Sequence, residues 1–345
     1  VEIAKAMSYN PSVLMLDEPT SALAHHETQS LFGLIRRLAK KDVAIIYITH
    51  RLGELKEIAD EITVLRDGEL IGTVSMEDVS SEDIVHMMFG KTVPKQRPGD
   101  LKVGDETILK VEGLCRKDKF SDVSFEVKKG EILGIAGMLG AGRTELLKGI
   151  FGGEGYDSGE IDFGGINVGR SNPVKMKRMG MGFTPENRKD EALVQILSVR
   201  ENMCMAGRDK MSRGGIITKA KERAACERMV EKLQISLSSS ETSVSSLSGG
   251  NQQKVVVGNW LGIDPEIILF DEPTRGIDVE AKQQIFEIMW ELSRKGVSSI
   301  FVSTELEELV EVCHRIVVMQ RGRIVDEIEA DKISADELFV KCMES

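Results

Sequence analysis

The sequence predicts an α/β protein built from two related modules, and three observations lead to this prediction. A strand-like run at 132–135 leads into a glycine-rich loop, and a helical pattern follows at 143–151. This order opens a mononucleotide-binding α/β unit. A segment of twenty residues recurs in the second half of the chain. The longest apolar runs, such as 43–48 and 267–270, have the length of strands and are far too short to span a bilayer.

Composition limits the classes of function. The 345 residues are 41% hydrophobic and 29% charged, which is ordinary for a soluble globular protein. The formal net charge of −11 argues against a nucleic-acid binder, because such proteins carry a basic footprint. The five cysteines are scattered and form no Cys-x-x-Cys pair. We therefore expect buried, reduced thiols, and neither a disulfide framework nor a zinc site.

Internal repetition organises the chain. The segment 1–20 recurs as 255–274, at a spacing of 254 residues. Each copy has an apolar helix, an Asn-Pro or Asp-Pro turn, a four-residue apolar strand and then Asp-Glu-Pro-Thr. A match of this length indicates two copies of one module. Two further pairs of segments keep the same spacing: 44–50 with 298–304, and 62–68 with 316–322.

The repeat and the local composition divide the chain. Residues 1–90 are predicted to be the C-terminal part of a first module, and residues 107–345 a complete second module. Between them, 91–106 is polar, contains Pro and Gly, and lacks apolar periodicity, which predicts a linker. Helical spacing with charged flanks at 221–233 predicts a helical subdomain at about 190–254.

The glycine-rich loop fits the phosphate-binding pattern G-x-x-x-x-G-K-[ST] except at one position. Its glycines Gly137, Gly140 and Gly142 let backbone N–H groups close around phosphate oxygens at a helix N-terminus. Thr144 would offer its hydroxyl to Mg²⁺. Arg143 stands where lysine is expected, and its planar fork does not replace a compact ammonium. The loop therefore predicts nucleotide binding with inefficient hydrolysis. A glycine-rich turn without a ligand is the alternative.

Paired carboxylates end one apolar strand in each copy of the repeat. Asp271 and Glu272 follow the run 267–270, and Asp17 and Glu18 occupy the matching positions. A buried strand delivers the first carboxylate to the metal shell and the second to the attacking water, as general base or water-orienting group. Two copies, each followed by Pro-Thr, favour this chemistry over a solvated strand end.

A third motif opens the helix that leads into the second copy. Ser248, Gly249 and Gly250 belong to the run LSGGNQQK, and taken alone they could simply cap this helix. Together with GEILGIAGMLGAGRTELLKGIFG and DEPTRGID, however, the run resembles tandem ATP-binding proteins of the ABC transporter superfamily, in particular the sugar-import type for ribose, galactosides and xylose. The resemblance implies P-loop NTPase nucleotide-binding domains with a mixed sheet core, an antiparallel β subdomain and a helical signature subdomain.

In this family ATP lies between two modules, so each site combines the phosphate loop of one module with the signature of the other. The resemblance implies that one site uses Asp17, Glu18 and the switch histidine His50 of the first module. The second module would lend this site the signature residues 248–250 and the D-loop residue Asp278. All of these have the residue types that hydrolysis needs.

The opposite site collects the departures from the family pattern. Arg143 replaces lysine, Thr304 stands where His50 stands in the repeat, and Ala24 stands where Asp278 does. Glu186 takes the position of a γ-phosphate-sensing glutamine. The Asp-Glu pair persists in both copies, so we expect one competent site and one degraded site.

The resemblance also implies a function. We expect the ATP-binding and ATP-hydrolysing subunit of a monosaccharide importer, ribose-type first and galactoside or xylose next, with ATP and Mg²⁺ as cofactors. The expected partners are membrane permease subunits and an extracytoplasmic sugar-binding protein, with no nucleic acid and no direct sugar contact. The protein would lie peripherally on the cytoplasmic face of the cell membrane.

Two alternatives compete with this expectation. A soluble tandem ABC ATPase acting on the ribosome or nucleic acid would keep both phosphate loops in standard form and carry a long charged linker. A non-catalytic regulator would not need Asp17, Glu18 and His50. Because the first copy of the repeat begins at Val1, we also expect the chain to be a fragment. Its first phosphate loop would lie upstream, and it would hydrolyse ATP poorly by itself.

Overall fold

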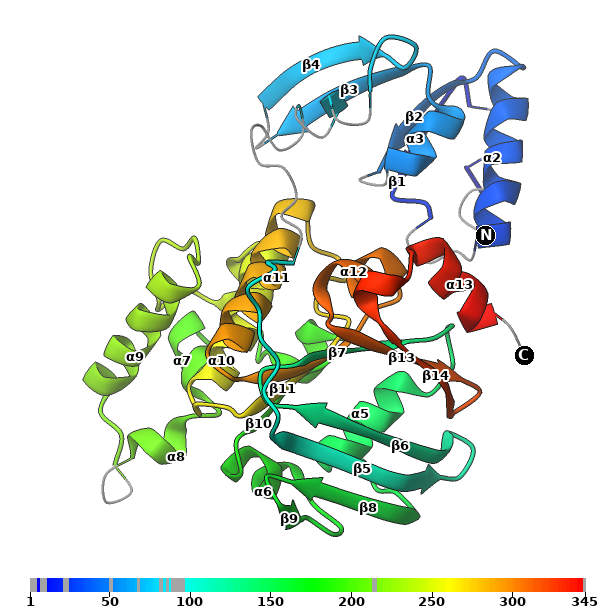
Figure 1. Ribbon diagram of the computed structural model, residues 1–345. Coiled ribbons are helices and arrows are strands. Elements are labelled where there is room, and N and C mark those ends of the chain that lie inside the picture. The colour runs from blue at the N-terminus through cyan, green and yellow to red at the C-terminus, as the bar shows by residue number, and fades with distance from the viewer. Residues whose placement is uncertain are drawn as a thin grey trace. The chain divides into compact units, whose positions relative to one another are not determined.

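The computed structural model describes residues 5–6, 11–20, 25–49, 52–66, 69–80, 83–84, 87, 97–212 and 216–343. The chain forms two compact units, Val1–Pro94 and Lys95–Ser345 (Figure 1). Among the described residues, no helix is both long enough and apolar enough to cross a membrane.

A six-stranded mixed sheet forms the centre of the second unit. Its first five strands run parallel and the last is antiparallel. Every residue of the three central strands is buried, because both faces of the sheet are covered. The strand order is β10 (Met181–Thr184), β11 (Ile267–Asp271), β12 (Ser298–Val302), β7 (Ile132–Ala136), β13 (Arg315–Gln320) and β14 (Arg323–Glu329).

Alternate residues of this sheet enter two apolar cores. On β11, Ile267 and Leu269 join a core shared with helix α5 (Arg143–Phe151) and a four-stranded antiparallel sheet. Ile268 and Phe270 point into the other core, which is closed by helices. The antiparallel sheet has the order β6 (Phe120–Lys128), β5 (Thr107–Arg116), β8 (Ser158–Phe163) and β9 (Ile166–Asn167).

Helices cover the second core and form one flank of the unit (Figure 1). The flank contains the helix at 219–232, where the sequence predicts helical spacing. The helices that follow α5 in the chain are α6 (Pro173–Arg178), a π-helix (Arg188–Ala192), α7 (Val199–Cys204), α8 (Arg208–Met211), α9 (Lys219–Lys232), α10 (Gly249–Leu261), α11 (Val279–Arg294), α12 (Leu306–Val312) and α13 (Ala335–Met343). Short 3-10 turns occupy Val244–Ser246 and Ala330–Lys332.

The first unit repeats the second half of this fold. Each of its elements begins 254 residues before its counterpart: β1 (Val13–Asp17), α2 (His25–Ala39), β2 (Ala44–Ile48), α3 (Leu52–Ile58), β3 (Glu61–Arg66) and β4 (Glu69–Ser75). Side-chain contacts repeat as well. The Thr20 hydroxyl donates to Glu54 at 2.6 Å, and the Thr274 hydroxyl donates to Glu308 at 2.7 Å. The repeat seen in the sequence is therefore a structural repeat.

One face of the β1–β2 pair differs from its counterpart in burial. Its side chains are 47–67% exposed, whereas the matching side chains of β11 and β12 are at most 1% exposed. In the second unit, Leu146, Leu147 and Ile150 of α5 share the core with those side chains. Among the described residues of the first unit, no such helix covers the face. The four exposed side chains are Val13, Met15, Ile46 and Ile48.

Residues 97–106, from the predicted linker, lie within the second unit. The Arg97 guanidinium donates to the Cys313 carbonyl and pairs with Asp331. Asp100 accepts two hydrogen bonds from Arg294, each 3.1 Å long. These contacts fix the segment on the surface of the second unit. The rest of the predicted linker, 91–96, lies outside the described residues.

All five cysteines are free thiols. Four of them are buried, and Cys115 is half-buried. Burial raises the pKa of the Cys204 thiol to about 11 and that of Cys226 to about 12. The expectation that the cysteines are buried is confirmed for these four side chains.

Candidate nucleotide-binding and active site

The glycine-rich loop joins the end of β7 to the start of α5. A Cβ at Gly137 would lie 2.4 Å from the Met319 carbonyl oxygen, and one at Gly142 would lie 2.6 Å from that of Lys119. Gly140 has open space around it but a φ of +81°, and Gly142 has a φ of +95°. Gly137 and Gly142 are thus needed for close backbone approach, and Gly140 and Gly142 for left-handed dihedral angles. The loop presents the N-terminus of α5, a position that favours anions.

Thr144 and Asp271 form the polar contact beneath this loop. The Thr144 hydroxyl donates to Asp271 Oδ1 at 3.1 Å. Asp271 is fully buried at the end of β11, and its Oδ2 has no hydrogen-bond partner among the described residues. Burial raises the pKa of Asp271 to about 6. A hydroxyl oxygen beside an unpaired carboxylate oxygen is the kind of donor set that Mg²⁺ takes. These residues therefore fit the predicted cation.

Glu272 is held in a strained backbone conformation, with a φ of +48°. Its Oε2 accepts hydrogen bonds from the Thr304 backbone N–H at 3.1 Å and from the Thr304 hydroxyl at 3.2 Å. Its Oε1 lies 3.6 Å from Arg143 Nη2. Burial raises the pKa of Glu272, and the positive charge of Arg143 opposes this rise.

Arg143 is the second charge of this buried cluster. Its side chain is 7% exposed, and Nη1 donates to the Ser303 carbonyl at 2.8 Å. Arg143 and Thr304 are two separate departures from the family pattern in the sequence, and both contact Glu272. A lysine has no second nitrogen with which to reach the Ser303 carbonyl and Glu272 in this forked way. The departures therefore form one interaction network.

Glu186 follows β10 and does not stand free. It forms an ion pair with Arg275, which lies in the loop after the Asp-Glu strand. The structure thus brings the predicted glutamine position next to the segment that leads to Asp278, about ninety residues away in the chain.

The signature residues lie at the start of α10, beside the start of α11. Ser248 caps α10 by accepting from the Asn251 backbone N–H at 3.4 Å. Asp278 caps α11 by accepting from the Ala281 backbone N–H at 2.9 Å. A Cβ on Gly250 would lie 2.3 Å from the Cβ of Ala281, so the two helix N-termini touch there. Ser248 therefore does cap α10, as the sequence alone allowed.

Substituting Gly250 tests this contact. We expect Gly250→Ala to lower the free energy of unfolding of the second unit by about 1–3 kcal/mol, because the new methyl group overlaps Ala281. In the double variant, Ala281→Gly should restore most of this lost stability because it removes the overlapping methyl group. Glycine at a helical position lowers the stability by up to about 1 kcal/mol, so the recovery should be incomplete by that amount. Urea denaturation of the four proteins gives the coupling energy directly. Additive effects of the two substitutions would contradict the contact.

The first unit carries the matching carboxylates at the end of β1. Asp17 and Glu18 are both exposed. Glu18 has a φ of +42°, and its N–H donates to the Ile48 carbonyl at 2.9 Å. Glu272 repeats both features, with a bond of 3.0 Å to Val302. The strained glutamate is therefore a property of both copies. His50 and Ala24 lie outside the described residues.

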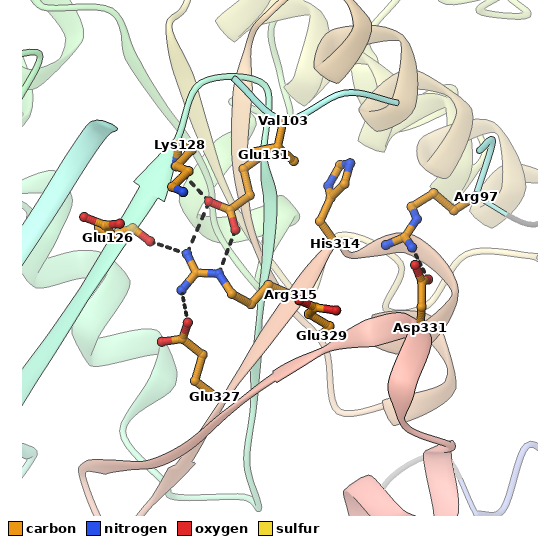
Figure 2. A pocket seen from close by; sticks show the side chains of 10 residues that line it. All are labelled: Arg97, Val103, Glu126, Lys128, Glu131, His314, Arg315, Glu327, Glu329 and Asp331. Carbon is orange, nitrogen blue, oxygen red and sulfur yellow. Dashed lines mark hydrogen bonds and ion pairs between the residues drawn. The ribbon is translucent and has the colours of Figure 1, made fainter. Parts of the chain in front are cut away.

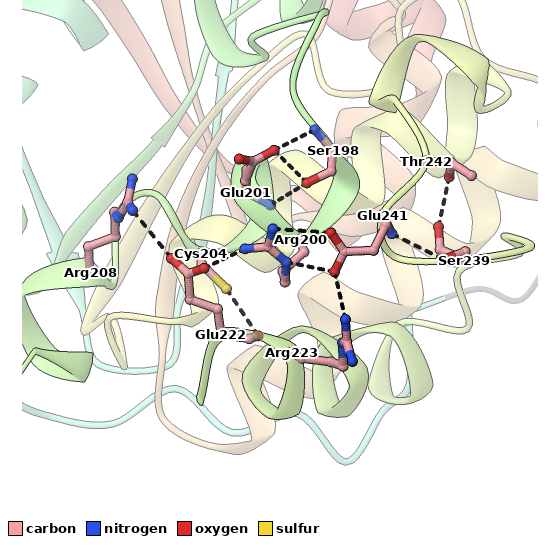
Figure 3. Close-up of polar contacts among 10 residues, drawn as sticks. All are labelled: Ser198, Arg200, Glu201, Cys204, Arg208, Glu222, Arg223, Ser239, Glu241 and Thr242. Carbon is pink, nitrogen blue, oxygen red and sulfur yellow. Dashed lines mark hydrogen bonds and ion pairs between the residues drawn. The ribbon is translucent and has the colours of Figure 1, made fainter. Parts of the chain in front are cut away.

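A buried ion-pair network supports the chain that leads into the signature (Figure 3). Arg200 of α7 is 4% exposed and pairs with Glu222 of α9, which is 6% exposed. Its Nε also donates to Glu241 at 2.9 Å, in the loop seven residues before Ser248. No motif in the sequence marks these residues.

A second charged cluster lies at the opposite end of the sheet, where β7 and β13 begin. It lines a cavity of about 360 Å³ and is organised by Arg315 (Figure 2). Arg315 donates to both oxygens of Glu131, to Glu327 and to the Glu126 carbonyl. The guanidinium of Arg315 therefore donates to groups of the protein itself, and it links the antiparallel sheet to the central sheet. The cluster therefore has a structural role.

Comparison with known proteins identifies the class. The ABC transporter family profile matches residues 120–275, a span that contains the glycine loop, the signature and the Asp-Glu strand. A nucleotide-free ATP-binding cassette of an ABC transporter aligns with 69% of this chain and 99% of its own, with a TM-score of 0.59 and 21% identity. The cassette MJ0796, in a post-hydrolysis state with ADP and Pi, aligns with 64% of this chain and 98% of its own. The TM-score is 0.58 and the sequence identity is 20%. These likenesses define the fold as an ATP-binding cassette.

Curated relatives cover nearly the whole chain. An uncharacterized ABC transporter ATP-binding protein of Escherichia coli, YphE, is 43% identical over 98% of this chain and 67% of its own length. The ribose import ATP-binding protein RbsA of Bacillus cereus is 41% identical over 98% of this chain and 69% of its own length. A putative ribose/galactose/methyl galactoside import ATP-binding protein of Rhizobium johnstonii is 43% identical over 96% of this chain and 65% of its own length. The chain belongs to the ATP-binding proteins of ABC transporters. The predictions of an ABC fold and of an ATP-hydrolysing enzyme are confirmed.

Proposed function

We propose that the chain is the ATP-hydrolysing component of a monosaccharide importer, with ribose as the first candidate substrate and galactosides or xylose next. ATP hydrolysis is supported above all by the hydrogen bond from the half-buried Thr144 to the buried Asp271 under the glycine loop, and by the unpaired oxygen of that carboxylate. The names of the B. cereus and R. johnstonii relatives support the sugar half.

The site residues divide the chemistry among them. Gly137, Gly140 and Gly142 would surround the nucleotide phosphates with backbone N–H groups, and Arg143 would add positive charge. Thr144 and Asp271 would hold Mg²⁺, as Asp17 would in the first module. A cation held by these residues would neutralise the negative charge that develops on the phosphates during transfer.

We propose that the two modules contribute unequally. Glu18, assisted by His50, would orient and deprotonate the attacking water in the site that hydrolyses ATP. Ser248, Gly249, Gly250 and Asp278 would complete that same site from the second module. Glu272 is the corresponding residue of the other site, where its contacts with Thr304 and Arg143 hold it away from this task, and Glu186 is paired with Arg275.

We further propose that the first module, 1–90, is completed by a segment with its own phosphate loop. The exposed apolar face of β1 and β2 supports this, because α5 covers the matching face in the second module, 107–345. The chain spans about two thirds of the length of its relatives. The chain joined to such a segment is called the complete ATPase below. By itself the chain should hydrolyse ATP far more slowly, and a comparable rate would contradict this proposal.

The proposed partners follow from the family. Membrane permease subunits would bind the protein at the cytoplasmic face of the membrane, and an extracytoplasmic protein would supply the sugar. No sugar would contact this chain, and the acidic net charge of −11 argues against nucleic acid as a partner.

Uptake of labelled sugars tests the proposed function. A strain that lacks this protein should lose uptake of ribose, galactose or xylose, and the wild-type gene should restore it. Glu18→Gln should not restore it, because the hydrolytic step is lost. Unchanged uptake of all three sugars in the deletion strain would overturn the assignment to monosaccharide import.

A further inference from the structure

The segment that follows Glu186 contains an unusual helix. Residues Arg188–Ala192 form a π-helix, capped by Asn187, whose side chain accepts from the Asp190 N–H at 3.3 Å. Single π-turns are rare in proteins and often mark functional positions. Here the turn projects the Arg188 side chain towards the loop that precedes Asp278.

Arg188 holds that loop with both arms of its guanidinium. Nη1 donates to the Arg275 carbonyl at 2.7 Å, and Nη2 donates to the Gly276 carbonyl at 2.8 Å. Gly276 has a φ of +65°, a conformation that lets its carbonyl stand beside that of its neighbour. Two parallel bonds from one rigid fork fix the loop more firmly than a single ammonium could.

The signature glycine Gly249 lies directly against this fork. A Cβ on Gly249 would lie 2.7 Å from Arg188 Nη2 and 2.9 Å from the Gly276 carbonyl oxygen. The φ of Gly249 is not left-handed, so glycine is required there for space and not for its dihedral angle. The start of α10, the Arg188 fork and the loop before α11 are therefore packed as three layers.

Two further ion pairs anchor the same short segment. Glu186 pairs with Arg275 on the loop, and Glu191 lies 2.9 Å from Lys148 of the phosphate-loop helix α5. The π-helix thus touches the signature, the loop leading to Asp278 and the helix that follows the glycine loop. Each of these elements carries residues proposed to meet nucleotide.

We infer that Arg188 is a positioning residue that holds the signature start and the Asp278 loop in one fixed arrangement, so that both reach the nucleotide together. The inference rests on the proposed function for its effect on hydrolysis. Its geometric part rests on the contacts of Arg188 alone. Without the fork, Gly249 and Gly276 lose their shared partner, and α10 and the loop can move independently.

The test compares Arg188→Lys and Arg188→Gln with a matched control, Arg228→Gln, at an exposed position of α9. Hydrogen exchange of the chain reports the amides of 249–252 and 275–278. We expect exchange there to speed up about tenfold or more in both Arg188 variants and to stay unchanged in Arg228→Gln, because opening of a local segment sets the exchange rate. In the complete ATPase, kcat should fall about tenfold with KM for ATP within about twofold, because only the closed state uses the arrangement.

The outcomes separate the inference from the proposed function. Unchanged exchange and unchanged kcat in both Arg188 variants would overturn the inference. A fall in kcat that tracks a general fall in Tm would also overturn it, since that indicates a merely structural residue. A wild-type complete ATPase without activity would overturn the proposed function, and the exchange data would then decide the inference.

Discussion

In the complete ATPase, Glu18→Gln is expected to reduce kcat by about 100-fold or more, whereas Glu272→Gln should leave at least about a third of it. General-base catalysis contributes roughly 10²–10⁴-fold to such reactions. An amide keeps the shape of the side chain but cannot accept the proton. Steady-state ATP hydrolysis by the two purified variants measures both values.

The physical reason for the difference lies around Glu272. Its Oε2 is occupied by two hydrogen bonds from Thr304, and Arg143 lies beside its Oε1. Both oxygens of this carboxylate are therefore engaged within the second module, so Glu272 is poorly placed to take a proton from a water molecule although burial raises its pKa. In the sequence repeat, His50 occupies the position that corresponds to Thr304. Equal losses from the two substitutions would contradict the proposal of one competent site.

Arg200→Ala is expected to lower the free energy of unfolding by about 3–5 kcal/mol. The substitution leaves Glu222 buried without its principal charge partner, and an unpaired buried charge has a cost of this size. It also removes the bonds to Glu241 that hold the loop before the signature (Figure 3). Urea denaturation, followed by circular dichroism, measures the change.

Arg223→Ala provides the matched control. Arg223 pairs with the same Glu241 at 3.3 Å, but its side chain is 56% exposed, so the loss should be below about 1 kcal/mol. The effect of Arg200→Ala should also depend on pH. Arg200 holds the pKa of Glu241 at about 2, below its ordinary value of 4.5. This stabilisation is present above pH 4.5 and is lost as the pH falls towards 2, so the difference between wild type and variant should shrink there. Similar losses from Arg200→Ala and Arg223→Ala would contradict the network.

The repeat and the strand ends can be predicted from the sequence because both are local patterns. The spacing of 254 residues recurs at the first residue of each of the six elements β1, α2, β2, α3, β3 and β4. Thr144 and Asp271, predicted from two separate motifs, are in contact. The carboxylates of both copies end parallel strands, as the apolar runs indicate.

The contacts that sequence reasoning missed join residues far apart and belong to no motif. Arg188 reaches the carbonyls of residues 87 and 88 positions away, and carbonyls carry no sequence signal. Arg200 and Glu222 are ordinary charged residues until the fold buries them together. The steric reason for Gly249 is visible only when Arg188 is placed against it. The signature motif identifies Gly249, and the fold shows why glycine is needed there.

The central claim is that the signature of the second module serves the hydrolytic site of Glu18. The most direct test is the effect of Ser248→Ala on single-turnover ATP hydrolysis by the complete ATPase, in three backgrounds. We expect Ser248→Ala to slow hydrolysis about tenfold in the wild type and in Glu272→Gln, and to cause no further loss in Glu18→Gln, because groups that act on one nucleotide are not additive. Any loss of helix capping is common to all three backgrounds and cancels. If Ser248→Ala instead kept its full effect in Glu18→Gln and lost it in Glu272→Gln, the signature would serve the other site and the claim would be wrong.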